Sequence, residues 1–316
     1  MFLGVLFGVL GCALWGLIYI VPLLLPDYSP ATIAMGRFAV YGACSLVLCW
    51  YYRRELSALK ASDWLKAFCL GFFGNAVYYI FLTQGIRWAG VPTSGMLMAL
   101  IPLNVALLTN RPGARTSVVV PWPRLWLPLL MILLGLWIGN IDEFSEISSR
   151  TSSKEYWLGF LCSATAMALW TWFPIRNSQW LIAHPKISPV VWTCAQGGSM
   201  FPATVLCFAA VNFDSWINGA SFLGSDPTAF IWVMLIAGVA CGWGGMALWN
   251  MMSARLPVAL SGQMIVFETI FSVIYALIYK QQAPGWTLVV GLVLLLSGVS
   301  ISLKVFQDAS RQKKSA

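Results

Sequence analysis

Apolar residues gather along this chain in long runs, separated by short segments that hold most of the charged side chains. A helix needs about 20 apolar residues to cross the roughly 30 Å core of a bilayer, because each residue rises only about 1.5 Å. Ten runs approach that length: Leu3 to Leu25, Ala31 to Tyr52, Ala67 to Ile86, Val91 to Asn110, Leu125 to Ile141, Tyr156 to Ile175, Pro189 to Phe213, Thr228 to Ala254, Pro257 to Tyr279 and Pro284 to Leu303. The alternating ten-residue segments typical of outer-membrane barrels do not occur. The pattern predicts an all-α membrane protein with ten transmembrane helices.

Composition excludes a soluble protein. Of the 316 residues, 59% are apolar and 9% are charged, whereas a soluble protein has roughly 45–50% and about 25%. The first run lacks a basic n-region and exceeds the roughly 7–15 residues of a signal-peptide core, so we expect it to be retained as a helix. The eight cysteines all fall in apolar runs, which is typical of small core residues rather than of a disulfide framework.

The net charge of +8 can indicate a nucleic-acid partner, but the basic residues alternate from loop to loop as the positive-inside rule predicts. If the N-terminus is cytoplasmic, four basic residues fall outside: Arg87, Arg150, Lys154 and Lys280. Fourteen then fall inside: Arg53, Arg54, Lys60, Lys66, Arg111, Arg115, Arg124, Arg176, Lys186, Arg255, Lys304, Arg311, Lys313 and Lys314. We therefore expect a multi-pass membrane protein with both termini in the cytoplasm and no nucleic-acid partner.

Two halves of five helices are indicated by matching motifs. Because five is odd, a second copy of the first half must enter the membrane upside down. The matches, in order, are Ala13-Leu14-Trp15 with Ala168-Leu169-Trp170, Ser29-Pro30 with Ser188-Pro189, Pro92-Thr93-Ser94-Gly95 leading to Pro102 with Pro257 and Ser261-Gly262 leading to Glu268-Thr269, and Gly135 with Gly298. We expect two inverted five-helix repeats around a central cavity, over residues 1–141 and 156–305, with an external connecting loop 142–155 and a cytoplasmic tail 306–316.

With these motifs the chain resembles the bacterial drug/metabolite transporter superfamily, in particular its ten-helix metabolite and amino-acid exporters of the EamA type. The resemblance is carried by the Ala-Leu-Trp pattern in the first and sixth helices, and by Arg37-Phe38, Tyr79, Pro102, Trp249-Asn250 and Glu268. The family usually has Glu-Pro where this chain has Glu268-Thr269, and often an acidic residue where Gln281 and Gln282 stand. The resemblance implies a location in the bacterial inner membrane. It also implies a central cavity between the two halves that opens to one side of the membrane at a time, through which amino acids, amines or other small metabolites are exported.

Glu268 is one of two charged residues in the ten runs, and it lies eleven residues into the ninth helix. A charge near the bilayer midplane costs at least ~2.5 kcal/mol, which makes such a residue a functional candidate. It can act in proton coupling or pair with the amine of a substrate. The structural alternative is a neutral or bridged carboxyl that holds neighbouring helices together; we favour function.

Arg37, the other embedded charge, lies roughly 10 Å below the outer end of the second helix. It can bind a substrate carboxylate bidentately or form a charge pair with Glu268 if the second and ninth helices meet. It can also be a structural arginine that caps carbonyls, pairs with an acid or extends outward along its apolar stem. Here we favour the structural interpretation slightly.

Aromatic and amide side chains within the runs complete the candidate substrate site. Trp15 and Tyr19 lie one turn apart on one face of the first helix, and Tyr78, Tyr79, Trp170 and Trp249 can extend this lining, which would bind planar rings or cations. Asn250, beside Trp249, and Gln263, just over one turn before Glu268, are amides that can face the same cavity. Ordinary packing and interhelical hydrogen bonding are the alternatives.

The leading functional hypothesis is a secondary active transporter, not an enzyme, that moves a small-molecule substrate through the lipid bilayer by alternating access. The alternative is an integral-membrane enzyme acting on a lipid or small amphiphile, but such a site needs several titratable groups at one depth. No cofactor or metal site is expected: no Walker motif occurs, and His184 is the only histidine. The small-xxx-small spacings, such as Gly4/Gly8, do not by themselves indicate a dimer, so we expect a monomer or a weak homodimer.

Overall fold

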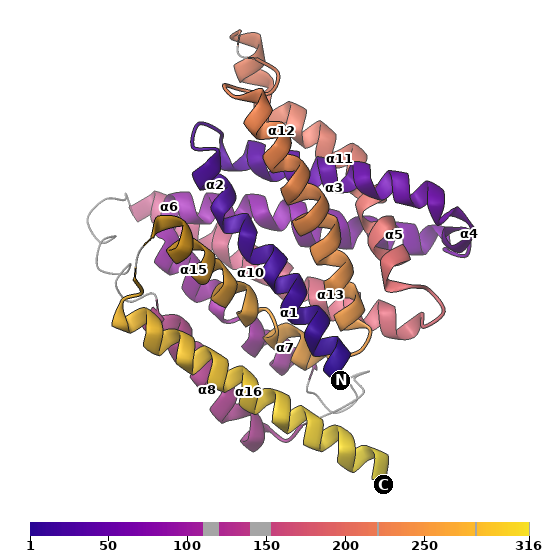
Figure 1. The fold of residues 1–316 in the computed structure, drawn as a ribbon, viewed down its shortest axis with the longest axis vertical. Helices are drawn as coiled ribbons and strands as arrows, with labels where there is room; N and C mark the ends of the chain where they lie inside the picture. Colours follow the sequence, from indigo (N-terminus) through magenta and orange to yellow (C-terminus); the bar gives the residue numbers. More distant parts are fainter. Residues whose placement is uncertain (110–119, 140–152, 220, 282, 316) are drawn as a thin grey trace.

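The structure, a computed structural model, describes residues 1–109, 120–139, 153–219, 221–281 and 283–315, and all of its regular elements there are helical (Figure 1). Most of the predicted connecting loop 142–155 lies outside the described residues, as do Arg111, Arg115 and Arg150. In chain order the elements are α1 (Phe2–Gly16), η1 (Leu17–Ile20), α2 (Val21–Leu24), α3 (Pro30–Tyr51), α4 (Arg53–Leu56), α5 (Ala61–Gly71), η2 (Phe72–Val77), α6 (Tyr78–Ala99), α7 (Ile101–Thr109), α8 (Trp122–Gly139), α10 (Ser153–Ala183), α11 (Pro189–Ile217), α12 (Pro227–Leu235), η3 (Ile236–Gly244), α13 (Gly245–Ser253), α14 (Val258–Gln263), α15 (Val266–Lys280) and α16 (Trp286–Ser315).

Nine helical stretches of the described residues are long and apolar enough to cross a membrane, and they coincide with nine of the ten predicted runs. The remaining run, Val91 to Asn110, differs from the prediction. Helix α6 continues through the expected boundary between the third and fourth helices, and the chain breaks at Leu100 instead. Pro102 follows this break as the second residue of α7, where its missing N–H removes no helical hydrogen bond.

Several helices are longer than the apolar runs that predict them. Helix α10 continues to Ala183, past the predicted end at Ile175, and α16 continues to Ser315, so the predicted tail 306–316 is a helical extension in the described residues. Helix α5 begins six residues before the predicted start at Ala67 and includes Asp63. The Asp63 carboxylate is buried and accepts a hydrogen bond from the indole of Trp180 at 3.1 Å. In α5, a neighbouring helix thus supplies the partner of a polar residue that lies beyond the apolar run.

Two Ser-Pro pairs begin the second and seventh membrane helices in the same way. The Ser29 hydroxyl accepts a hydrogen bond from the backbone N–H of Thr32 at 3.0 Å, and the Ser188 hydroxyl accepts one from that of Val190 at 3.3 Å. In each helix a proline follows as the first residue. Serine satisfies an unpaired amide at the helix start, and proline fixes the backbone angle without losing a bond.

The contacts between helices recur when each helix is replaced by its counterpart in the other half of the chain. Helix α10 packs on α6 as α1 packs on α13, and α10 packs on α7 as α1 packs on α15. The pairs α3 with α11, α8 with α16, and α7 with α14 are their own counterparts under this exchange. A π-helical stretch also interrupts the third membrane helix (η2) and the eighth (η3). These pairings are consistent with two inverted repeats.

The glycine contacts between α8 and α16 are reciprocal in detail. A Cβ on Gly135 would lie 2.7 Å from the carbonyl oxygen of Gly291, and a Cβ on Gly298 would lie 2.8 Å from that of Pro128. The interval from Gly135 to Gly298 is 163 residues, and so is the interval from Pro128 to Gly291. Only residues without a side chain allow the two backbones to approach this closely.

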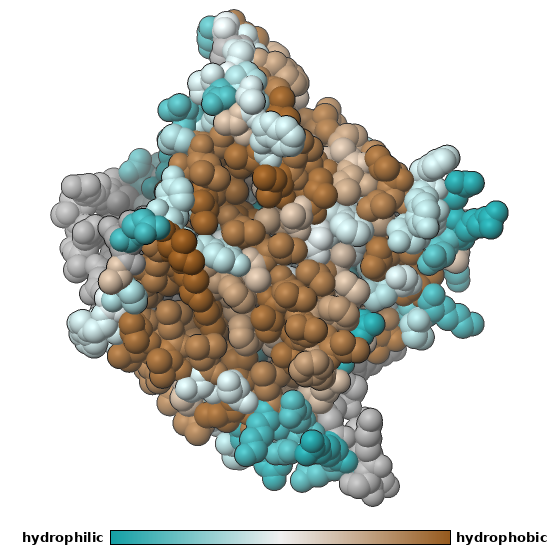
Figure 2. Space-filling model, in the orientation of Figure 1, coloured by the Kyte–Doolittle hydropathy of each residue, from teal (hydrophilic) through white to brown (hydrophobic). Residues whose placement is uncertain are grey.

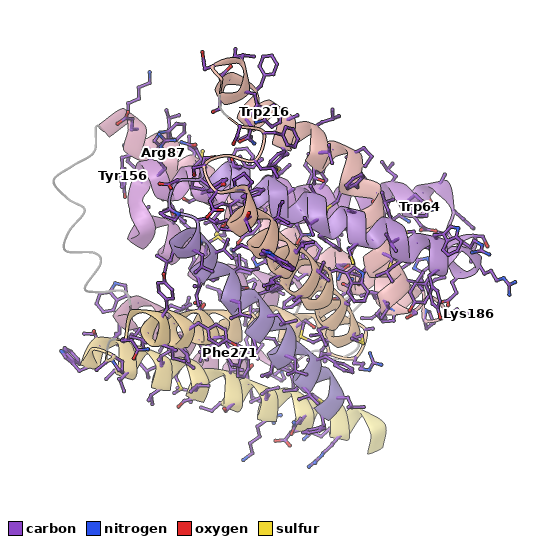
Figure 3. The ribbon with its side chains drawn as sticks, turned by 45° about the horizontal axis from the view of Figure 1, so that its top comes forward. Trp64, Arg87, Tyr156, Lys186, Trp216 and Phe271 are labelled. Carbon is purple, nitrogen blue, oxygen red and sulfur yellow. The ribbon has the colours of Figure 1, made fainter. Side chains whose placement is uncertain are left out.

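The surface divides into an apolar belt and two polar ends. In Figure 2 the apolar side chains cover the middle of the visible face, and the hydrophilic ones gather toward its edges. Figure 3 shows Arg87 and Tyr156 at one end of the bundle, here called the Arg87 end, and Trp64 and Lys186 at the opposite end, here called the Trp64 end. Both chain termini lie at the lower right of Figure 1, so α1 begins where α16 finishes.

We predict that Gly135→Ala lowers the melting temperature of the purified protein by at least about 3 °C, because overpacking a tight contact costs about 1–3 kcal/mol. The matched control is Gly139→Ala in the same helix, where a Cβ would meet its nearest atom at an ordinary 3.8 Å. That variant should melt at or above the wild-type temperature, since alanine favours the helix. Equal melting temperatures for the two variants would contradict the reciprocal packing of α8 and α16.

Candidate functional site

A cavity of about 300 Å³ lies between the helices at the Arg87 end, at the lower limit of the roughly 300–1,000 Å³ typical of small-molecule sites. Pro22 of α2, Pro30 at the start of α3, and Ile86, which precedes Arg87 in α6, line it. The lining is supplied by the first, second, third, sixth, eighth and ninth membrane helices. Helices from both parts of the chain therefore build one site.

Glu268 lines this cavity from the first turn of α15. The ninth membrane helix is interrupted at Met264 and Ile265, between α14 and α15, so Glu268 stands beside the amide end of a new helix, which attracts negative charge. The hydroxyl of Tyr19 donates a hydrogen bond to Glu268 Oε1 at 3.1 Å. Tyr19 itself lies in η1, where the first membrane helix changes from α to 3₁₀ geometry.

Arg37 enters the same cavity from α3. Its guanidinium carbon lies 4.4 Å from the ring centre of Phe38 and 5.3 Å from that of Tyr79, so the charge rests on aromatic faces. Within the described residues Arg37 has no ion pair, and its buried Nε has no hydrogen-bond partner. Within the described residues, no acid or backbone carbonyl pairs with the Arg37 guanidinium. The structural role that the sequence slightly favours therefore has no partner there. Arg37 and Glu268 share the cavity but do not form a salt bridge.

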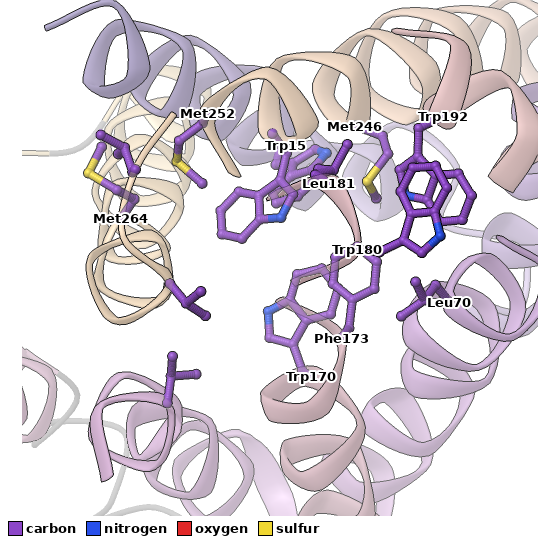
Figure 4. Close-up of a cluster of buried hydrophobic side chains, with 14 of the residues drawn as sticks. Trp15, Leu70, Trp170, Phe173, Trp180, Leu181, Trp192, Met246, Met252 and Met264 are labelled. Carbon is purple, nitrogen blue, oxygen red and sulfur yellow. The ribbon is translucent and has the colours of Figure 1, made fainter. Parts of the chain in front are cut away.

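Aromatic rings form the deep wall of the cavity. The rings of Tyr78 and Trp170 stack with centres 4.7 Å apart, and Trp15 lies 5.8 Å from Trp170. Figure 4 shows Trp15 and Trp170 in the buried cluster, with Phe173 next to Trp170. Trp15, Trp170, Tyr78, Tyr79 and Tyr19 all line the cavity, so the structure brings these five predicted residues together.

Three other predicted residues lie outside the cavity lining in this conformation. Trp249 is fully buried behind Trp15, with ring centres 5.1 Å apart. Asn250 is fully buried within hydrogen bonds to neighbouring helices, and the fully buried Gln263 accepts a hydrogen bond from Ser302 on α16. Their positions in apolar runs predict burial, but the direction of each side chain depends on packing that spacing does not show.

Beyond the aromatic wall lies a ring of three amides, here called the amide triangle: Asn177, Gln196 and Asn250. Asn177 Nδ2 donates to Asn250 Oδ1 at 2.7 Å, Asn250 Nδ2 donates to Gln196 Oε1 at 2.9 Å, and Gln196 Nε2 donates to Asn177 Oδ1 at 3.0 Å. Trp192 and Thr193 also bond to this ring, at 2.9 Å each. All these residues are at most 1% exposed.

The sequence analysis missed Asn177 because it lies two residues past the predicted end of the sixth helix. The apolar residues Trp180 and Leu181, which follow it, were a signal that the helix continues. Asn75, which is not among the predicted site residues, also lines the cavity and stands in the π-helical stretch η2.

Comparisons with known proteins agree with this architecture. Residues 2–110 match the model of the EamA-like transporter family. The chain is 30% identical over 306 residues to the inner membrane protein YtfF of Escherichia coli (strain K12), covering 95% of each chain. It also superimposes on a solved crystal structure with a TM-score of 0.70 at 17% identity, over 96% of this chain and 98% of the other, which supports the fold alone.

The identity with YtfF extends over both parts of the chain, whereas the family model matches its first third. Together with the nine apolar helices, these likenesses identify a multi-pass protein of the inner membrane. They point to a membrane transporter of the drug/metabolite type rather than to an enzyme. The chain belongs to the EamA-like transporter family.

Proposed function

We propose that this protein is a secondary active exporter that moves a small metabolite, such as an amino acid, an amine or a drug-like compound, across the inner membrane by alternating access. One observation carries the proposal: two embedded charges of opposite sign, Arg37 and Glu268, line a single aromatic cavity without pairing with each other. An unpaired charge inside a membrane protein is expensive unless water or a ligand compensates it. A substrate with complementary charges supplies that compensation.

Each wall of the cavity suits one part of such a substrate. The Glu268 carboxylate can accept hydrogen bonds from an ammonium group, and the Arg37 guanidinium can bind a carboxylate through two parallel bonds. Trp15, Trp170 and Tyr78 offer ring faces to an apolar or aromatic side chain, or to a cation. Glu268 is also the embedded carboxyl that can carry a proton, so substrate and proton would compete for one group.

The closed side of the bundle supports alternating access. The cavity is lined near the Arg87 end and stops at Trp15 and Trp170, behind which Trp249 and Asn250 are fully buried. A substrate can therefore reach the site from one side at a time. Gln263 is not part of the proposed lining, because its side chain accepts a hydrogen bond from Ser302 of α16. The protein would work as a monomer or a weak homodimer.

The proposed orientation places both termini and the Trp64 end in the cytoplasm. Basic residues are concentrated in the segments at that end, as the positive-inside rule requires. The cavity then faces outward in this conformation.

We expect Glu268→Gln to reduce uptake of an amino acid or amine driven by a pH gradient in proteoliposomes by at least about tenfold, because an amide neither exchanges a proton nor pairs with an ammonium group. Glu55→Gln is the matched control, since it makes the same change at an exposed carboxyl outside the lining. It should retain most of the flux. Undiminished flux in Glu268→Gln would refute the assigned role, and a covalently altered product would favour the enzyme alternative.

We expect Arg37→Met to abolish thermal stabilisation by amino acids but to preserve stabilisation by the corresponding decarboxylated amines. The lost contact to the carboxylate is charge-assisted and worth about 1.5–3 kcal/mol, which is roughly a tenfold to hundredfold change in affinity. Arg87→Met serves as the control, because Arg87 is exposed and lies outside the lining. Equal loss for amino acids and amines would indicate that Arg37 only supports the fold.

We expect affinity tags at either terminus to resist protease added to intact cells and to be cleaved after the inner membrane is opened. A tag in the Asp214 to Asp226 segment, on the opposite side in this topology, is the positive control. Cleavage of a terminal tag from outside would contradict the proposed orientation, because ten spans put both termini on one side and the positive-inside rule assigns that side to the cytoplasm.

A further inference from the structure

The amide triangle occupies positions that correspond to the open cavity. Trp170 follows Trp15 by 155 residues, and Asn177 follows the cavity-lining Pro22 by the same interval. Ser188-Pro189 follows Ser29-Pro30 by 159 residues, and Gln196 follows the cavity-lining Arg37 by that interval. Two members of the triangle thus stand where the other half of the chain lines the cavity.

The third member, Asn250, can be matched to a cavity-lining residue through equivalent contacts between helices. A Cβ on Gly4 would meet Leu256 and Arg255, and one on Gly159 would meet Ala89 and Trp88. Both pairs of neighbours are separated by 167 residues. At this interval Asn250 corresponds to Thr83, which lines the cavity.

Ser253 gives an independent indication that this region opens. At the same interval of 167 residues it corresponds to Ile86, near the mouth of the cavity. Its hydroxyl is fully buried and has no hydrogen-bond partner among the described residues. An unsatisfied buried hydroxyl costs about 1–3 kcal/mol, and contact with water or a ligand in another conformation would remove that cost.

We propose that the amide triangle is a latent second binding site: it is closed here, and it becomes the lining of a cavity at the Trp64 end when the open cavity closes. This inference rests on the proposed function. In the closed form the three amides satisfy one another in a ring, so the site remains stable without ligand. On opening, the same donors and acceptors become free for the substrate's ammonium and carboxylate groups.

The two sites would hold the substrate with different strength. The open cavity offers Arg37 and Glu268, whereas the latent site offers neutral amides at the position matching Arg37. At the interval of 167 residues Glu268 corresponds to Ile101, which has no charge. In the open cavity both partners of each contact with such a substrate are charged, whereas in the latent site only the substrate's groups are, and the attraction between opposite charges adds to the hydrogen bond. The latent site is therefore the weaker of the two.

The test uses two cysteine reporters in the full chain, with its eight native cysteines replaced, reconstituted in liposomes and treated with a membrane-impermeant maleimide. Ile86→Cys reports the open cavity and Ser253→Cys reports the latent one. We expect Asn250→Leu, which breaks two sides of the triangle, to raise the alkylation rate of Ser253→Cys by at least about fivefold and to lower that of Ile86→Cys. The Ser253→Cys reaction should occur only from the Trp64 side.

Controls separate opening of a site from general loosening. Thr193→Val is a milder variant that removes one acceptor of Asn250, and it should shift both rates in the same directions by a smaller amount. Gln263→Leu breaks a buried amide contact outside the triangle and should change neither rate. An Ile132→Cys reporter, fully buried between α8 and α16, should stay unreactive throughout.

Opposite changes at the two reporters support the latent site. Parallel increases, or no change at either reporter, overturn it and leave the amide triangle a structural contact. The assay needs no substrate, so it is independent of flux. If the protein shows flux that depends on Glu268 but the two alkylation rates do not change in opposite directions, only this inference is refuted. If no preparation shows flux, the proposed function is refuted.

Discussion

Hydrocarbon offers no hydrogen-bond partner, so every polar group in these helices must be satisfied inside the bundle or face a water-filled space. The amide triangle meets this requirement completely, since each of its members donates to the next. Arg37 and Glu268 face the cavity instead: Tyr19 donates one hydrogen bond to Glu268, but no ion pair joins the two charges. This contrast between a closed neutral ring and two open charges distinguishes the sealed side of the protein from the cavity.

Close contact between helices allows the neutral amide ring and the charged cavity to lie within one bundle. The backbones of α8 and α16 meet at Gly135 and Gly291, which allows a peripheral pair to pack without large side chains. Nearer the centre, the helices are interrupted rather than merely packed: η2, η3 and the gap between α14 and α15 redirect the backbone beside the cavity. The interruptions place Asn75 and Glu268 where a regular helix would give each a different direction.

The sequence predicts the fold well because run length and loop charge are set directly by the bilayer. Nine apolar runs and both Ser-Pro helix starts are confirmed. The boundary before Val91 is wrong, since a continuous helix there depends on neighbours that composition does not reveal. Trp15 and Tyr19 could be predicted from helical periodicity, and Glu268 from the free-energy cost of a charge in the membrane. The hydrogen-bonded ring that includes Asn250 could not, because it depends on Asn177, a residue beyond the predicted helix.

The distribution of charge distinguishes the open cavity from the closed side of the bundle. If the two halves exchange roles during transport, identical halves would bind the substrate equally on both sides and the gradient alone would set the net flow. Here Gln196 stands at the position equivalent to Arg37, and Ile101 at that equivalent to Glu268, so the open cavity carries both charges and the equivalent positions on the closed side carry none. Protonation can then act on one conformation and not on the other. Because a ligand or proton shifts an equilibrium only through its different affinity for two states, this asymmetry is the feature through which a proton gradient could drive the cycle.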